Sequence, residues 1–181
     1  MILTRALKPT IVRDEYRVAL QALQQPLYDN GAYVTGQPGI GKYQTICGVS
    51  LSLNSTHIVS PGKTLFLVYL LVYFLGQKVA VAVQLPHKDP HYAFFTGNGV
   101  SIQSVLVADP MVEYLGTIWA LCDSSQTIIN PSTVFLQLDG NVRVIQTTSP
   151  KASRWKEWTK HTGARRYVMD IWSTEEIMAL A

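Results

Sequence analysis

Two short stretches of the sequence carry residue types suited to binding phosphate. The first contains three glycines and then a lysine, and its residues are Gly36, Gln37, Pro38, Gly39, Ile40, Gly41 and Lys42. Glycines let successive backbone N–H groups turn toward phosphate oxygens, and the lysine can reach the outer phosphates. Such a loop ends in Ser or Thr, whose hydroxyl binds Mg²⁺, but Tyr43 stands at that position. The motif therefore lacks its last member.

The missing part of the motif occurs further along the chain. Gly62, Lys63 and Thr64 precede an uninterrupted apolar run from Leu65 to Leu75, a pattern that favours a buried helix. Joining Gly41 to Lys63 gives a complete phosphate-binding loop, the Walker A motif, that leads into its helix. We therefore interpret residues 42–62 as an insertion in the fold.

The codons that can encode the two junctions suggest an origin for the insertion. Gly41-Lys42-Tyr43 can be written with a eukaryotic donor splice signal, and Ser60-Pro61-Gly62 can be written to end in an acceptor signal. Residues 42–62 number 62 − 42 + 1 = 21, so a retained intron would keep the reading frame. The alternative is a genuine insertion in a degenerate nucleotide site. Either Lys42 or Lys63 could contact phosphate, and a helix N-terminus behind Lys63 favours Lys63.

A different candidate for chemistry is an apolar stretch that ends in an acidic residue. Residues 117–123 end in Asp123, and a carboxylate at the carboxyl end of a strand can bind Mg²⁺ directly or through water. Enzymes that hydrolyse ATP at such a site usually place Glu or Asp next, to polarise the attacking water. Ser124 stands there instead, so the sequence predicts no catalytic residue.

A third stretch, residues 142–150, is typical of a core strand that ends in hydroxyl side chains. In folds of this kind a polar side chain at the strand end can sense the outermost phosphate of the nucleotide. Ser149 and Thr148 are the candidates. Equally, these two residues could only cap a helix predicted over 151–160.

The remaining pattern predicts an α/β protein in which a parallel sheet lies between two layers of helices. Strands are expected at 33–35, 79–85, 117–123, 142–150 and 167–171, with helices at 16–24 and 65–75 and a β-hairpin formed by 92–95 and 100–102. Residues 1–30 are interpreted as a lead-in. Residues 31–181 are interpreted as one domain, truncated at its C-terminal end.

The composition and charge of the chain indicate which classes of protein are expected. Of 181 residues, 48% are hydrophobic and 15% charged, which favours a globular domain. The net charge of +3 comes mostly from residues 151–166, and a solvated helix explains these better than nucleic-acid binding does. The first twenty residues mix charged and apolar side chains and predict no secretory signal, hence an intracellular protein. The run 65–75 is too short to span a membrane.

Short motifs across residues 32–177 resemble those of a known family. Besides the glycine-rich loop and the strand to Asp123, the similarity rests on Thr148-Ser149-Pro150, Trp155-Lys156-Glu157-Trp158, Tyr167-Val168-Met169 and Trp172-Ser173-Thr174-Glu175-Glu176-Ile177. Together these are similar to the P-loop NTPase domains of Crinkler and retrotransposon-hot-spot-type proteins, which are related to AAA+ and signal-transduction ATPases.

That resemblance implies a set of roles. Lys42 or Lys63 would contact the phosphates of ATP, Thr64 and Asp123 would hold Mg²⁺, and Ser149 would occupy the sensor position. Members of the family carry a helical lid and further domains downstream, through which protein partners would be recruited. Neither is expected here.

We expect this chain to bind a nucleotide, ATP or GTP, with weak or absent hydrolysis. The alternative is a remnant or protein-interaction module that binds no nucleotide, encoded by a mis-spliced and truncated gene. A nucleic-acid-binding role for residues 151–166 is a third and less favoured hypothesis.

Overall fold

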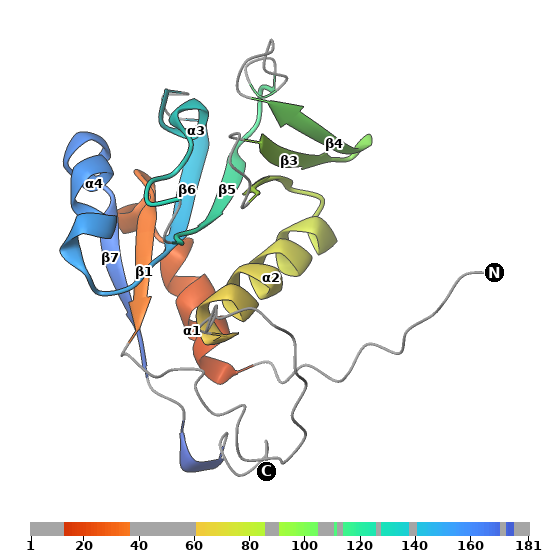
Figure 1. Ribbon diagram of the computed structural model, residues 1–181. Helices are drawn as coiled ribbons and strands as arrows, with labels where there is room; N and C mark the ends of the chain where they lie inside the picture. The colour runs from red at the N-terminus through yellow and green to blue at the C-terminus, as the bar shows by residue number, and fades with distance from the viewer. Residues whose placement is uncertain are drawn as a thin grey trace, which may run out of the picture.

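The computed structural model describes residues 13–36, 61–85, 91–104, 111, 114–125, 128–137, 141–170 and 173–175 (Figure 1). Its helices are α1 (Asp14–Leu23), η1 (Pro26–Tyr28), α2 (Pro61–Gly76), α3 (Thr133–Gln137), η3 (Ala152–Arg154) and α4 (Lys156–Thr162). Its strands are β1 (Ala32–Gly36), β2 (Ala80–Gln84), β3 (His91–Thr96), β4 (Gly99–Ser104), β5 (Ile118–Asp123), β6 (Val142–Thr147) and β7 (Arg165–Met169).

The strands form one sheet in the order β4-β3-β2-β5-β6-β1-β7. From β2 to β7 all neighbours are parallel, whereas β3 and β4 form an antiparallel hairpin on β2. The predicted α/β class and the predicted hairpin are confirmed. The sheet as a whole is mixed rather than parallel, because a short turn such as Gly97-Asn98 can join only antiparallel strands.

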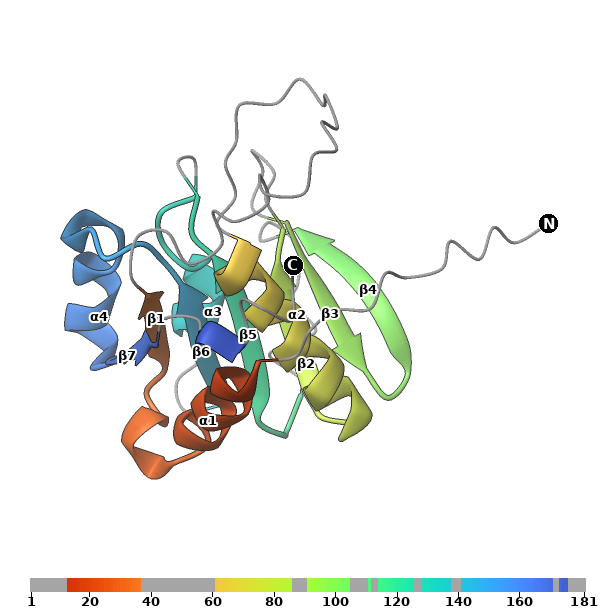
Figure 2. The same cartoon turned by 90° about the horizontal axis from the view of Figure 1, so that it is seen from below.

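Helices α1 and α2 cover one face of the sheet (Figure 2). Phe66, Leu70 and Phe74 recur every fourth residue on α2 and are fully buried there. Tyr16 of α1 contacts Phe66, with ring centroids 5.4 Å apart, and Phe74 stacks on Trp119 of β5 at 4.5 Å. Fully burying each such side chain contributes about 2–3 kcal/mol. The helix α1, which falls within the predicted lead-in, is therefore part of the hydrophobic core.

The shorter helices α3 and α4 cover the opposite face. Phe135 of α3 and Trp158 of α4 are buried against the sheet. The Trp158 indole N–H donates to Gln146 Oε1 at 2.7 Å, and Gln146 Nε2 donates to the Ile129 carbonyl at 2.6 Å. A buried glutamine of β6 thus joins α4 to the segment that follows β5.

The predicted helix over 151–160 is divided in the structure. Trp155 separates η3 from α4, because its backbone φ of −141° lies outside the helical region and its ring stacks on Tyr33 at 4.5 Å. Trp155 is the N-cap of α4, and no side chain caps that helix. The alternative role of Thr148 and Ser149 as caps of this helix is therefore wrong.

The predicted strand limits differ from those observed by one or two residues in most strands, and the differences matter most in two of them. β6 ends at Thr147 rather than Pro150, and β7 runs from Arg165 to Met169 rather than over 167–171. The start of β7 is hidden in the sequence because Arg165 and Arg166 lie exposed at the sheet edge, where apolar periodicity is not required. None of the helices in the described ranges has the length and apolarity that crossing a bilayer requires.

Candidate functional site

Asp123, the last residue of β5, binds hydroxyl groups from two other elements. Its Oδ2 accepts a hydrogen bond from Thr64 Oγ1 of α2 at 2.7 Å, and its Oδ1 accepts one from Thr147 Oγ1 of β6 at 2.8 Å. The β5–β6 register places Asp123 directly beside Thr147. Each carboxylate oxygen therefore has one hydroxyl partner, and the three side chains form one cluster.

The N-terminal end of α2 lies at this cluster. Lys63 and Thr64 occupy the first turn of the helix, which begins at Pro61, so the backbone N–H groups of that turn have no partner within the helix. Burial lowers the pKa of the Lys63 ammonium, and the negative charge of Asp123 opposes that shift. The Lys63 ammonium, the Thr64 hydroxyl and the N-terminal end of α2 therefore lie beside the Asp123 carboxylate. A lysine and a helix N-terminus both attract anions such as phosphate.

The ends of β1, β5 and β6 are tied together by backbone hydrogen bonds. Thr148 N–H donates to the Val34 carbonyl at 2.9 Å, and Ser124 N–H donates to the Thr147 carbonyl at 2.9 Å. The side-chain oxygens of Ser124 and Thr148 are buried, with no hydrogen-bond partner among the described residues. Buried hydroxyls are normally satisfied, so these two are exceptions among the described residues.

The strand order identifies the carboxyl ends of β1 and β6 as a topological switch point. From β1 the chain crosses to β2 through α2 on one face, and from β6 it crosses to β7 through α4 on the other. The two connections therefore leave these neighbouring strands in opposite directions (Figure 1). Ligands of open α/β sheets bind in the crevice at such a point. Thr147 and Gly36 end the two strands there, and Asp123 ends the next.

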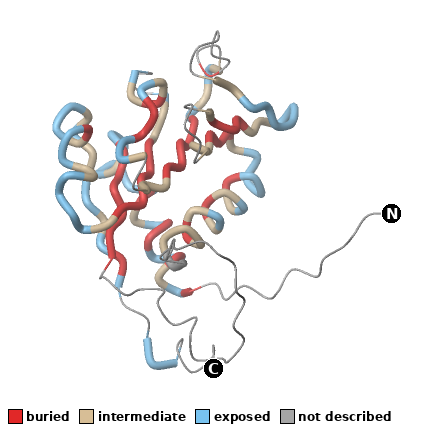
Figure 3. The backbone as a smooth tube through the Cα atoms, viewed as in Figure 1, coloured by how far each residue is buried: buried red, intermediate tan, exposed pale blue. Residues whose placement is uncertain are grey.

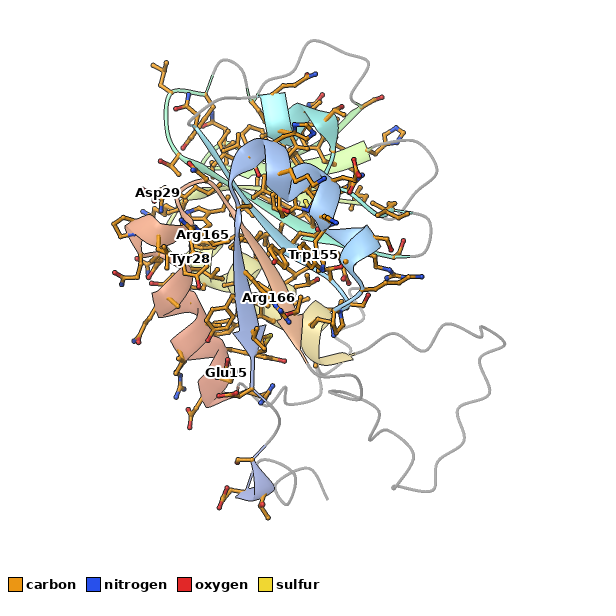
Figure 4. The ribbon with its side chains drawn as sticks, turned by 90° about the vertical axis from the view of Figure 1, so that its left-hand side faces the viewer. Glu15, Tyr28, Asp29, Trp155, Arg165 and Arg166 are labelled. Carbon is orange, nitrogen blue, oxygen red and sulfur yellow. The ribbon has the colours of Figure 1, made fainter. Side chains whose placement is uncertain are left out.

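A second positively charged side chain, Arg166 of β7, lies beside the carboxyl end of β1. Arg166 is exposed, and its Nε donates to Thr35 Oγ1 at 3.2 Å, beside Gly36 (Figure 4). Thr35 itself is buried. This hydrogen bond fixes one nitrogen of the guanidinium and holds the side chain next to the end of β1.

The structure brings together some of the residues predicted from the sequence. Thr64 and Asp123 are hydrogen-bonded, Lys63 adjoins them, Gly36 is the buried last residue of β1, and Gly62 lies in the first turn of α2. The residues from Gln37 to Lys42 lie outside the described part of the chain, as does most of the predicted insertion. Ser149 is described, but the hydroxyl that contacts Asp123 belongs to Thr147.

Thr147 was missed by the sequence analysis. It lies within a polar run of three hydroxyl residues at the end of β6, and only the register against β5 distinguishes it from Thr148 and Ser149. The alternation of side chains along a strand offered one signal. Thr147 lies two residues after Ile145, so the two side chains share a face of the sheet, and Ile145 belongs to the core beneath α2.

The donor set fits Mg²⁺ bound together with a phosphate ligand. Among the described residues, no three His, Cys, Asp or Glu side chains gather closely enough to hold a metal by themselves. Mg²⁺ is commonly held instead by one or two protein oxygens, with phosphate oxygens and waters completing its octahedron. Asp123 and Thr64 could supply the protein oxygens for such a site.

Comparison with known proteins found no match, either to a family model or to a curated protein sequence.

Proposed function

We propose that this chain binds a nucleoside triphosphate, with ATP as the first candidate, together with Mg²⁺, in a P-loop NTPase-like domain. The observation that carries the proposal is the pair of hydrogen bonds that Thr64 and Thr147 donate to Asp123. These bonds place a helix N-terminus, a carboxylate and a strand-end hydroxyl together at the switch point of the sheet. The same proposal extends to kinship with the Crinkler-type P-loop domains.

Each residue of the cluster has a defined part in this proposal. Lys63 would neutralise phosphate oxygens, and Thr64 Oγ1 and an oxygen of Asp123 would hold Mg²⁺, which supplies positive charge to the outer phosphates. Thr147 would keep the Asp123 carboxylate in position. Lys63 is favoured over Lys42 as the phosphate ligand because it lies in the first turn of α2. Lys42 lies outside the described residues and remains the second candidate.

We propose further that hydrolysis is weak or absent. Ser124 follows Asp123, and a serine hydroxyl does not abstract a proton from water at neutral pH without a base beside it. Ser149 stays a candidate for sensing the outermost phosphate. Thr148, the other residue predicted from the sequence, stays a candidate with it. Thr147 joins them, because it pairs with Asp123 across β5 and β6 and its hydroxyl contacts that carboxylate.

The test is a titration of a fluorescent ATP analogue, with and without Mg²⁺, into the full chain and its variants. Lys63→Met should weaken binding at least tenfold, because about 1.4 kcal/mol of phosphate interaction corresponds to a factor of ten. The matched control is Lys78→Met, which changes an exposed lysine just beyond the other end of α2. Asp123→Asn should abolish the Mg²⁺ dependence. Equal affinity of the Lys63→Met and Lys78→Met variants would overturn the assignment.

A chain that lacks residues 42–62 completes the experiment. If the full chain and the shortened chain bind comparably, residues 42–62 form a tolerated insertion. If only the shortened chain binds, the insertion disables the site, as expected for a retained intron. If neither binds, the proposal fails and the non-binding remnant stands.

A further inference from the structure

Arg166 of the edge strand β7 is held in place beside the end of β1. It pairs with Tyr33 in the β1–β7 register, and its Nε donates to Thr35 Oγ1 at 3.2 Å (Figure 4). β1 is buried along its whole length, whereas Arg166 is exposed (Figure 3). Among the described residues, no acidic side chain pairs with this guanidinium, and its terminal nitrogens have no hydrogen-bond partner. Its donors are therefore oriented but mostly unused.

Arg166 and Lys63 lie on opposite faces of the sheet. Tyr33 and Thr35 share one face of β1, and Tyr33 belongs to the core between the sheet and α4. Lys63 belongs to α2, which covers the other face. Arg166 therefore lies on the α4 side of the carboxyl edge, and Lys63 lies on the α2 side of the same edge.

The switch point of the sheet explains how one ligand can contact both sides. A ligand at such a point lies beyond the strand ends, in the crevice between connections that leave along opposite faces. It can therefore contact residues of either face. A chain of phosphate groups has several separate charges, so different positive side chains can bind different groups.

Thr148 is a second polar residue on the α4 side of this edge. Its N–H donates to the Val34 carbonyl at 2.9 Å, which places Thr148 beside Thr35. It follows Gln146, which bonds α4, by two residues, so alternation places its side chain on the same face. Thr148 is 1% exposed, and its Oγ1 has no hydrogen-bond partner among the described residues. An unsatisfied buried hydroxyl next to an oriented guanidinium points to a polar ligand.

We propose that Arg166 is a second phosphate-binding residue, whose terminal nitrogens bind a phosphate group of the nucleotide from the α4 side. This inference rests on the proposed nucleotide binding. A guanidinium can donate two parallel hydrogen bonds to phosphate, which fixes orientation as well as supplying charge. The bond to Thr35 already restricts the arginine, so binding costs less conformational freedom.

The neighbouring arginine provides a matched control. Arg165 is also exposed on β7, but it pairs with Ala32 and therefore lies on the opposite face from Arg166. Among the described residues its side chain makes no hydrogen bond. The variants Arg165→Gln and Arg166→Gln thus remove the same charge from adjacent positions, and only the second removes the guanidinium at the end of β1.

The test is a titration of a fluorescent ATP analogue with Mg²⁺ into the full chain and both variants. Arg166→Gln should weaken binding about tenfold, because charge-assisted hydrogen bonds to phosphate are lost. Arg165→Gln should change the affinity by less than about twofold. Arg166 is exposed, so the difference between wild type and Arg166→Gln should shrink as the salt concentration rises from about 50 to about 500 mM.

The variant Thr35→Val separates ligand contact from a purely structural role. It removes the oxygen that holds Arg166 but keeps the guanidinium, so it should weaken binding less than Arg166→Gln does. Thermal unfolding must show that each variant retains the fold. Equal losses in Thr35→Val and Arg166→Gln, independent of salt, would mean that Arg166 only supports β1, and the proposal would be wrong.

The remaining outcomes separate this proposal from nucleotide binding itself. If the wild type binds and Arg166→Gln binds equally well, Arg166 is not a ligand residue, and binding at Lys63 is unaffected by that result. Equal losses in Arg165→Gln and Arg166→Gln would also overturn the proposal, since they would reflect net charge alone. A wild-type chain that binds no nucleotide overturns both proposals.

Discussion

The Asp123 carboxylate is held by hydroxyl groups that lie 123 − 64 = 59 residues before it and 147 − 123 = 24 residues after it in the chain. A hydrogen bond to a charged group contributes about 1.5–3 kcal/mol to stability, and rather less where water competes. This cluster is half-buried, so each hydroxyl contributes toward the lower end.

Removal of one of these hydroxyls should lower stability measurably. Thr147→Val keeps the shape of the side chain and suits a strand, but it removes the donor to Asp123 Oδ1. We expect the free energy of unfolding, measured by urea denaturation, to fall by about 1–2 kcal/mol. Thr159→Val is the control, because that hydroxyl bonds only the exposed Lys156 carbonyl on the surface of α4. Losses of equal size in the two variants would contradict a special role for Thr147.

The stability of the chain should depend on the protonation of Lys63. Burial lowers its pKa below the ordinary 10.5, so the unfolded chain holds this proton more tightly than the folded chain. Below the folded pKa the lysine is charged in both states, and the folded state bears the full cost of burying the charge. As the pH rises from that pKa toward 10.5, the folded state loses the proton first, and the free energy of unfolding rises.

This dependence is measured as the difference in urea-unfolding free energy between wild type and Lys63→Met, from about pH 7 to about pH 10. The wild type should gain stability relative to the variant as the pH rises. Lys78→Met serves as the control, since it removes an exposed lysine. A constant difference, or one that changes in the opposite direction, would show that the burial of Lys63 is not the dominant cause.

At the scale of secondary-structure elements, β6 connects several parts of the structure through its side chains. Gln146 bonds α4 through Trp158 and the segment after β5 through Ile129. Its neighbour Thr147 bonds Asp123 on β5. One strand thus holds a helix, a loop and the candidate site in a fixed relation, which is how a binding geometry is maintained without a ligand.

Replacement of Gln146 by leucine should loosen these connections. The variant Gln146→Leu leaves the Trp158 N–H and the Ile129 carbonyl without their partner. Trp158 is buried, and an unsatisfied buried group costs about 1–3 kcal/mol, whereas Ile129 is exposed and its carbonyl can bond water. We expect the free energy of unfolding to fall by about 1–3 kcal/mol in urea denaturation. Gln24→Leu, at an exposed position after α1, should change it by less than about 0.5 kcal/mol. If the two variants lose similar stability, the network does not stabilise the fold.

The elements predictable from the sequence are those with long apolar patterns. The helix at 65–75 and the strands at 33–35 and 117–123 are confirmed. The two strands are buried along almost their whole length, and the helix buries Phe66, Leu70 and Phe74 against the sheet. The division of the helix over 151–160 was not predictable, since it depends on stacking of Trp155 on Tyr33, more than one hundred residues earlier in the chain. Neither was the order of the strands, which is decided by pairing across the whole sheet.

Part of the candidate site could also be predicted from the sequence. Thr64 could be predicted from the phosphate-binding motif. Asp123 could be predicted from its place at the end of a strand, because the carboxyl ends of parallel strands meet at one edge of the sheet. Thr147, the partner of Asp123, follows only from the register of β6 against β5. Arg166 was not singled out, because an exposed arginine on an edge strand has no sequence pattern of its own.

For the whole molecule, binding of nucleotide should appear as increased stability. A ligand at about one hundred times its dissociation constant raises the free energy of unfolding by about 2.7 kcal/mol if it binds only the folded state. For a chain of this size that corresponds to a rise of about 5–10 °C in the unfolding midpoint. We expect this rise in differential scanning calorimetry with ATP and Mg²⁺ together. Mg²⁺ alone is the control, and an unchanged midpoint with both would contradict binding.

The position of β1 has a consequence for synthesis of the protein. β1 is the first of the described strands, yet the described strands with which it pairs are β6 and β7, and Ala32 pairs with Ile145, which follows it by 145 − 32 = 113 residues. A ribosome that adds about 5–20 residues per second needs roughly 6–23 s to supply that partner. During this interval the apolar residues of β1 and α1 have emerged without the sheet they pack against. In the nascent chain β1 therefore stays without both of its neighbouring strands until the segment through Met169 has left the ribosome.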